Sequence, residues 1–470
     1  MQSLTASELG SYGNSVNKVA PVSDGTQWID YAASSFEGGE GTAESPYLIK
    51  TAEQLAKIAK DVRDIDTTYE DTYFKMVADI DLDGHEWTPI GYNYSEGDEI
   101  YKKDFMGKFD GDGHKIMNLY INGLSRDKSV GLFNNTEEGF ELRNLTIESG
   151  KIFGDMIVGG LVGYNNGLIE NCVNKATVQC VIYYAAGISG SNYRQGIIRQ
   201  CINYGEILAG KSGNGMTGAG ITSSCYGNVE ECANFGRVYS ITSGTGGIVG
   251  IHEGGVIRNC FNKGELVSDA NTVGGIVAQE LGRGGNCEIY NCYNAGKITG
   301  IEELGGVFGF AMFSSFNTLT VKDCYYSSDL FSGDSFGYYA DFFGLFNLTE
   351  APTMTSEDMM AESFVTTLNN GSGSEETVWM ADTKNINGGF PILSFMKDIS
   401  TGITTQKLAN NVKVYASGNM IVVEGAEGEP MQVYTTGGQM VYNGKAADTA
   451  IKAGMYVVRI NNNSYKVLVK

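Results

Sequence analysis

The sequence is poor in proline and histidine, and it lacks any long apolar run. Only 6 of the 470 residues are proline, whereas 64 are glycine. This balance favours many tight turns between short strands over long helices. No stretch of 18 consecutive apolar residues occurs, so we predict no transmembrane segment. The first residues, MQSLTASELGSYGNSV, lack the basic start and apolar centre of a signal peptide, so we expect a processed or recombinant chain.

Basic residues are outnumbered along most of the chain. The sequence has 33 Lys and Arg against 55 Asp and Glu, a net charge of −22. An acidic chain repels phosphate backbones, so we expect no nucleic-acid partner. The imbalance is uneven, because residues 400–470 carry 7 Lys and Arg against 4 Asp and Glu. We therefore expect the C-terminal part to be a separate unit.

A cysteine between polar residues recurs at nearly constant intervals. These cysteines stand at 172, 201, 232, 260, 292 and 324, which are 28–32 residues apart. Such a period marks a protein of stacked repeats. Each repeat has three short apolar pieces, such as GLIENC, ATVQ and GGLVG, which are too short for helices and rich in Val and Ile. Because every copy keeps the same order, we predict a right-handed parallel β-helix with three strands per coil rather than a meander of hairpins.

The recurring cysteines are predicted to be buried core residues, one per coil. Weaker copies of the repeat place Leu119 and Leu145 at the same position, and an exchange of leucine with cysteine indicates an apolar, inward-facing site. A zinc site is disfavoured, since neither paired CxxC motifs nor histidine clusters occur. Disulfides stay open as an alternative, because stacked strands bring Cα atoms to about 4.8 Å. Nine cysteines, however, cannot all pair.

Two polar patterns indicate how the coils are aligned. Asparagines lie two residues after five of the cysteines, where they suit strand corners and where stacked amides can bond from coil to coil: Asn174, Asn203, Asn234, Asn262 and Asn294. Two residues before the cysteine position the charge alternates, in the order Arg143, Glu170, Arg199, Glu230 and Arg258, followed by Tyr290 and Lys322. Parallel stacking in register would place each charge between opposite charges.

The repeats are flanked by segments of other kinds. TAEQLAKIAKDVRD predicts a helix capped by Thr51, with apolar residues at 55, 58, 59 and 62, and TSEDMMAESFVTTLNN predicts a second helix. After about residue 400, strands alternate with Gly and Asn turns. We predict a mainly β protein with an N-terminal tail (1–35), an α/β cap (36–118), the parallel β-helix (119–346), a second α/β cap (347–398) and a β-sandwich (399–470).

Several segments, taken in order, resemble a known family. FEGGEGTAESPYLIKTAEQLAKIAKDV, the units of the type GGLVGYNNGLIENCVNKATV and the closing WMADTKNINGGFPIL resemble bacterial surface proteins with GLUG-type repeats, over about 36–397. The last 70 residues, through GGQMVYNG and AGMYVVRINNNSYKVLVK, resemble the sorting tail of the type IX secretion system. The resemblance implies an exported, Bacteroidetes-like protein from a family whose members are mostly described as candidate adhesins.

Three motifs could suggest a metal, but each fits another interpretation better. Some relatives in that family join such repeats to an immunoglobulin A metallopeptidase, yet HEWTP at 85–89 lacks the second histidine of the HExxH zinc motif. DIDLDG at 79–84 matches half of an EF-hand loop, but its twelfth position would be Ile90 instead of a glutamate. FDGDGH at 109–114 is typical of a tight turn. We therefore expect no metal site and no cofactor.

The loops after the third apolar piece carry the candidate binding residues. They place Tyr164, Tyr193, Tyr226 and His252 near one corner of the coil. Tyrosine rings with polar tips stack on sugars or anchor protein partners. The alternative is that these residues only cover the edge of the coils.

These observations favour a non-catalytic binding or adhesion protein, secreted or at the outer cell surface. Its partner would be a glycan or protein of host or bacterial origin. The alternative is a carbohydrate-active β-helix enzyme, either a polysaccharide lyase or a glycoside hydrolase, which needs carboxylates converging from adjacent coils. Acidic residues in the repeats alternate with basic ones or stand singly, as Glu265 and Asp269 do, so we expect no enzymatic activity.

Overall fold

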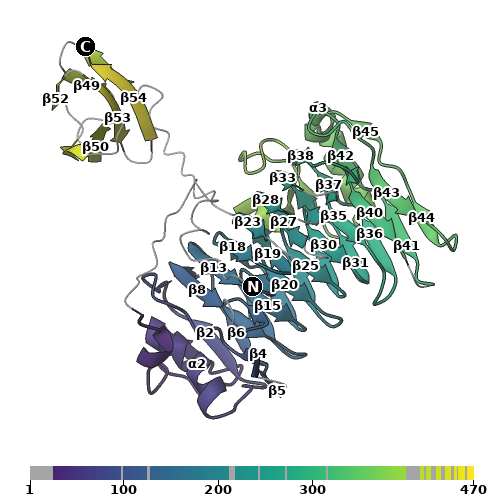
Figure 1. The fold of residues 1–470 in the computed structure, drawn as a ribbon, viewed down its shortest axis with the longest axis horizontal. Helices are drawn as coiled ribbons and strands as arrows, with labels where there is room; N and C mark the ends of the chain where they lie inside the picture. Colours follow the sequence, from purple (N-terminus) through teal and green to yellow (C-terminus); the bar gives the residue numbers. More distant parts are fainter. Residues whose placement is uncertain are drawn as a thin grey trace. The chain divides into compact units, whose positions relative to one another are not determined.

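The chain divides into two compact units, Met1–Lys397 and Asp398–Lys470. The computed structural model describes the first unit from residue 25, except for 97–98, 124–126, 211–216, 242–243, 270–271 and 314–315. In the second unit it leaves out 399–412, 418–419, 425–429, 436–439, 446–448, 453, 461–462 and 470. The first unit is a stack of parallel β coils with helices at its N-terminal end (Figure 1).

One coil of the stack contains five short strands. In the coil around Cys172 they are β16 (Leu168–Glu170), β17 (Val173–Asn174), β18 (Thr177–Cys180), β19 (Tyr184–Ala186) and β20 (Ser189–Asn192). Each strand pairs in parallel with its counterpart in the next coil, which confirms the predicted parallel β-helix. The expected three strands per coil were too few. The Cys-x-Asn piece forms a strand of its own, and pieces such as GGLVG bend between two strands, β14 (Ile157–Gly159) and β15 (Val162–Asn165).

The five sheets begin and end at different places along the chain. The sheet through β16 runs from β1 (Tyr47–Ile49) to β44 (Phe346–Leu348), and that through β17 runs from β3 (Ile80–Asp81) to β45 (Thr353–Met354). The sheets through β18, β19 and β20 start at β8 (Leu119–Gly123), β9 (Ser129–Val130) and β10 (Phe133–Asn135) and end at β38 (Ile298–Thr299), β39 (Leu304–Gly305) and β43 (Phe336–Ala340). The stack therefore extends into both segments that the sequence assigned to caps.

The N-terminal end is covered by helix α2 (Ala52–Asp64). Its N-terminus is a capping box, in which the Thr51 side chain accepts from the backbone of Gln54 and the Gln54 side chain accepts in return. The predicted apolar face at 55, 58, 59 and 62 is fully buried. The prediction of a tail over 1–35 is wrong for its last part. The 3₁₀ turn η1 (Trp28–Tyr31) packs on the core, and the Trp28 ring nitrogen donates to the Leu82 carbonyl at 2.9 Å. Residues 1–24 lie outside the described part.

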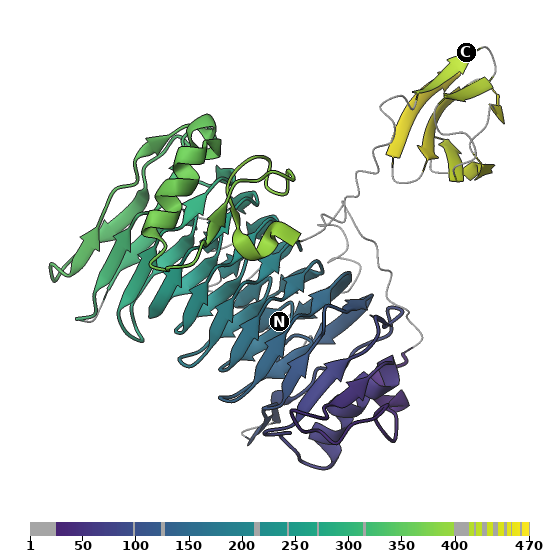
Figure 2. The same ribbon diagram turned by 180° about the vertical axis from the view of Figure 1, so that it is seen from behind.

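The C-terminal segment of the first unit packs along the side of the stack and not over its end. It contains α3 (Ser356–Met360), α4 (Glu362–Gly371), β46 (Trp379–Met380) and β47 (Ile392–Leu393), and Figure 2 shows α4 lying across the strands. The rings of Trp379 and Phe364 lie 5.5 and 5.9 Å from that of Tyr293, and Asn291 donates to the Leu368 carbonyl at 2.8 Å. Aromatic side chains that point out of one sheet thus fix this segment.

The six repeat cysteines form the predicted buried ladder, but one of the two predicted leucine positions does not belong to it. All nine cysteines of the chain are free and buried, and burial raises the pKa of the Cys172, Cys232 and Cys292 thiols. Leu145 belongs to the ladder, since it lies between strands β11 (Glu141–Arg143) and β12 (Thr146–Ile147), as Cys172 lies between β16 and β17. Leu119 does not belong, because it pairs with Gly150 in another sheet.

The asparagine ladder is buried and continuous. Each side-chain amide donates to the amide oxygen of the next coil, at 2.9 Å from Asn174 to Asn203 and from Asn203 to Asn234, and at 2.8 Å from there to Asn262 and on to Asn294. We expected this asparagine to take the left-handed conformation at the corner of the coil. The residue directly before each ladder position takes that conformation instead. Its φ lies between 51° and 55° at Asn144, Asn171, Gln200, Glu231, Asn259, Asn291 and Asp323. The amides instead tie neighbouring coils together.

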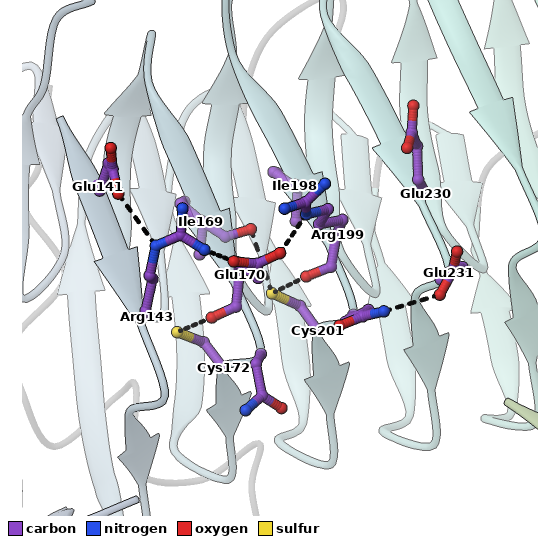
Figure 3. Close-up of polar contacts among 12 residues, drawn as sticks. Glu141, Arg143, Ile169, Glu170, Cys172, Ile198, Arg199, Cys201, Glu230 and Glu231 are labelled. Atoms are coloured by element: carbon purple, nitrogen blue, oxygen red, sulfur yellow. Dashed lines mark hydrogen bonds and ion pairs between the residues drawn. The ribbon is translucent and has the colours of Figure 1, made fainter. Parts of the chain in front are cut away.

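The alternating charges lie in register, as predicted. Arg143, Glu170, Arg199, Glu230 and Arg258 occupy successive coils at the same strand position. Glu170 forms ion pairs with both Arg143 and Arg199 (Figure 3). Farther along, Glu230 pairs with Arg258 at 3.1 Å. The outer face of this sheet is therefore a row of opposite charges.

The second unit is built from two antiparallel sheets. One contains β48 (Lys413–Ser417), β49 (Met420–Glu424) and β52 (Thr449–Ala450). The other contains β50 (Pro430–Thr435), β51 (Met440–Lys445), β53 (Gly454–Ile460) and β54 (Asn463–Val469). Side chains from both sheets share one small core, which includes Ile421, Val433 and Val458. This is the arrangement of a β-sandwich.

Candidate binding site

Three of the four predicted residues lie together on the outside of the stack. Tyr164 belongs to β15, whereas Tyr193 and Tyr226 directly follow β20 and β25 (Thr222–Cys225). The ring centroids are 5.5 Å apart both between Tyr164 and Tyr193 and between Tyr193 and Tyr226, and all three rings are partly exposed. Burial raises the pKa of the Tyr164 and Tyr226 hydroxyls, so these groups stay protonated and can donate hydrogen bonds. We call these three side chains the tyrosine row.

His252 does not join the tyrosine row. Its side chain is fully buried, and its Nδ1 lies 3.0 Å from a carboxylate oxygen of Glu280. The reason is register: His252 pairs with Cys225 and not with Tyr226, so it takes the inward position of its coil. A buried imidazole cannot contact an external ligand, and His252 is removed from the candidate site.

Glu253 takes the place that the sequence suggested for His252. Its backbone N–H donates to the Cys225 carbonyl, just as the Tyr226 N–H donates to the Asn192 carbonyl one coil earlier. The side chain is only 2% exposed, and one carboxylate oxygen lies 3.4 Å from Arg283. Its other oxygen, Oε2, has no hydrogen-bond partner among the described residues. Burial raises the pKa of this carboxyl. Alignment of the GIHEGG loop with the loop of Tyr226 in this register would have identified Glu253 from the sequence.

Two further features border the row beside Glu253. Tyr184 comes from β19 of the neighbouring sheet, and burial and the charge of Glu253 both raise the pKa of its hydroxyl. The loop that carries Arg283 also packs on Tyr226. A Cβ on Gly284 would lie 2.2 Å from the Cδ1 atom of that ring, so the close approach requires glycine. The site thus combines partly exposed aromatic rings with a guanidinium that is 60% exposed, whereas the Glu253 carboxylate that pairs with this guanidinium is buried.

The carboxylates on the charged face next to this region are held by basic groups. Arg143 lies 3.0 Å from Glu141 and also pairs with Glu170 (Figure 3). A shallow hollow farther toward the N-terminus is lined by Tyr73, Lys75, Lys108, Asp110, Glu141 and Arg143. Lys75 and Lys108 there pair with Asp112 and Asp71 at 3.0 and 3.2 Å.

Each of the two aspartate-rich motifs contains a tight turn, and the first also contributes Ile80 and Asp81 to strand β3. In DIDLDG, the Asp81 carboxylate accepts hydrogen bonds from the Asp83 backbone and the Asn118 amide, both at 2.8 Å. In FDGDGH, Asp112 and Gly113 have φ values of 49° and 80°, so this segment forms the predicted tight turn.

Comparison with known proteins supports part of the family resemblance. The family model of the GLUG motif matches residues 154–179. The chain contains a GLUG motif. This match spans β14, β15, β16 and β17 and most of β18, with Cys172 and Asn174 inside it. The motif therefore corresponds to about one coil of the stack.

Two relatives share a longer stretch of sequence. Halomucin of Haloquadratum walsbyi is 34% identical over 149 residues, which make up 30% of this chain and 2% of the relative. A protein of Evansella cellulosilytica, described as a candidate Gly-rich membrane protein, is 34% identical over 148 residues, or 30% of this chain and 15% of the relative. The chain thus spans only a small part of the length of these relatives.

A solved structure covers more of the chain at lower similarity. The crystal structure of a candidate immunoglobulin A1 protease from Bacteroides ovatus aligns with 77% of this chain and 95% of its own, at 20% identity and a TM-score of 0.47.

In the part of the chain that the structure describes, no helix is long and apolar enough to span a membrane.

Proposed function

We propose that this chain is a non-catalytic surface protein that binds glycans through the tyrosine row, as an adhesin does. The observation that carries the proposal is the 5.5 Å spacing of three partly exposed rings. Tyrosine faces stack on the apolar side of sugar rings, and the tyrosine hydroxyls and the exposed Arg283 guanidinium can bond to sugar hydroxyls. One relative is described as a membrane protein, which fits a location at the cell surface.

The non-catalytic character is part of the proposal. Cleavage of a glycosidic bond requires two carboxyl groups facing one bond, one of them protonated. Among the described residues beside the tyrosine row, Glu253 has a carboxyl whose pKa is raised by burial, and Arg283 lies next to it. On the charged face, Glu141 and Glu170 both contact Arg143. These contacts favour binding over hydrolysis.

Export to the cell surface belongs to the same proposal. The C-terminal unit is compact on its own and has an antiparallel β architecture, which suits the sorting-tail role implied by its sequence resemblance. Deletion of residues 398–470 should leave the first unit folded but retained inside a type IX-competent host. Unchanged surface display of the shortened chain would contradict the sorting role.

A glycan array, read beside an assay for released reducing ends, tests the proposed function. We expect the full chain to retain a subset of glycans without producing new reducing ends. The double variant Tyr193→Ala/Tyr226→Ala should lose that retention. Release of reducing ends would favour the carbohydrate-active enzyme instead. Retention of purified surface proteins but of no glycan would replace the glycan with a protein partner.

A further inference from the structure

A cluster of three metal-binding side chains lies inside the stack. His252 on β30 (Val249–His252), Glu280 on β35 (Val277–Glu280) and Cys287 on β36 (Cys287–Tyr290) each offer one ligand atom, and these atoms lie within 4.8 Å of one another. All three residues are fully buried. Neither the sequence nor the proposed glycan site accounts for this combination of donors.

The imidazole is oriented as a metal ligand would be. Its Nε2 lies 3.2 Å from the Gly255 carbonyl, so this nitrogen carries a proton and donates it. The other nitrogen, Nδ1, faces the Glu280 carboxylate at 3.0 and 3.1 Å. Histidines that bind metals usually fix their tautomer in this way, by donating the second N–H to a carbonyl or carboxylate.

Two residues of the cluster, His252 and Glu280, occupy a register position that carries amides earlier in the stack. Asn165 and Asn192 occupy the same register position in the preceding coils, and the Asn165 amide donates to the Asn192 oxygen at 2.8 Å. The following positions are Cys225, His252 and Glu280. An asparagine could continue the row without any titratable group. At His252 and Glu280 this position therefore changes from amides to an imidazole and a carboxylate, which can bind metals, and Cys287 joins them from β36 in another sheet.

We propose that His252, Glu280 and Cys287 supply three of the four ligands of a buried Zn²⁺ site. Sulfur, imidazole and carboxylate are the donors that Zn²⁺ takes in proteins, and tetrahedral geometry with bonds of about 2.0–2.3 Å places neighbouring ligand atoms about 3.3–3.5 Å apart. The Nδ1 and carboxylate oxygen are already close to this separation, and Sγ, which lies within 4.8 Å of them, needs a shift of at most about 1.5 Å.

Charge balance also allows the ion to be buried. A thiolate and a carboxylate together neutralise Zn²⁺, while the imidazole stays neutral. The ion replaces two protons, one from the Cys287 thiol and one shared between Nδ1 and the Glu280 carboxylate. Because two protons leave, zinc affinity should rise with pH. The site would then tie three successive coils together, through β30, β35 and β36.

Metal analysis of the full chain, produced and refolded with zinc, tests the site. We expect about one zinc per chain after removal of loosely bound metal. Cobalt in place of zinc should give a sulfur-to-cobalt charge-transfer band, which excess zinc abolishes. The variants Cys287→Ser and His252→Gln should lose the metal and the band, while Cys201→Ser, a matched buried cysteine outside the cluster, should keep both.

Two results would overturn the proposal. One is a folded wild-type chain with substoichiometric zinc and no cobalt band after refolding with either metal, which would show that the pair holds only protons. The other is a band of equal intensity in the folded Cys287→Ser chain, which would place the metal elsewhere. Far-ultraviolet circular dichroism of each variant establishes folding independently of metal content.

Discussion

The charge ladder offers the sharpest test of how the coils are aligned. Arg199 lies in register between Glu170 and Glu230, and it forms an ion pair with Glu170. The substitution Arg199→Glu removes this pair and places three carboxylates in a row. Two like charges one strand spacing apart, about 4.8 Å, repel by about 1 kcal/mol in a water-like dielectric. The new carboxylate has two such neighbours, which are only 15% and 18% exposed.

We expect Arg199→Glu to lower the free energy of unfolding by about 1–2 kcal/mol, since the side chains can turn partly toward water. Urea denaturation at low and high salt measures this value, and salt should reduce it because it screens partly exposed charges. Arg199→Gln should cost less, as it removes the attraction without adding repulsion. Arg194→Glu makes the same change in net charge at an exposed position beside Tyr193 and should cost less than about 0.5 kcal/mol. A cost below about 0.3 kcal/mol for Arg199→Glu, without salt dependence, would refute the predicted electrostatics.

Three further predictions concern the buried ladders and the two units. Cys260→Ala should cost about 1–2 kcal/mol because it opens a small cavity, and Cys260 should react slowly with thiol reagents in the native protein; rapid labelling would show that the site is open. Asn234→Ala should cost about 1–3 kcal/mol in urea denaturation, because it removes one buried hydrogen bond from each of the amides of Asn203 and Asn262; a neutral result would mean that the amide ladder is not a source of stability. A chain ending at Lys397 should keep its cooperative melting transition in calorimetry, because the two units have separate cores; loss of that transition would contradict independent folding.

Most of the fold could be predicted because two patterns in the repeat show which residues of neighbouring coils lie side by side. The exchange of Leu145 with the ladder cysteines marked an interior position, and the alternating charges at 143, 170, 199, 230 and 258 marked the neighbouring coils. Strands of two residues, such as β17, carry no periodicity, so the five-strand coil could not be predicted. The side packing of 347–398 depends on contacts of Trp379 and Phe364 with Tyr293, which are remote in sequence.

The candidate site was predictable only in part, because one of its four predicted residues is shifted by one position in its strand. The loops GYNNG, GSNYRQG and SSCYGN pointed to the tyrosine row, which the structure brings together. In GIHEGG the aromatic residue lies one position earlier, in register with Cys225, so His252 points inward and Glu253 follows the row. A shift of one residue turns a strand side chain to the opposite face. Composition alone cannot show such a shift.

The most direct test of glycan binding is the affinity of the tyrosine row for a glycan selected on the array. Calorimetric titration should show that Tyr193→Ala/Tyr226→Ala weakens binding at least tenfold, because an anchoring ring contributes more than about 1 kcal/mol. The matched control is Tyr239→Ala, which removes a half-buried tyrosine from another sheet and should leave the affinity unchanged. Equal affinity of the double variant and the wild type would contradict the proposed role of the tyrosine row.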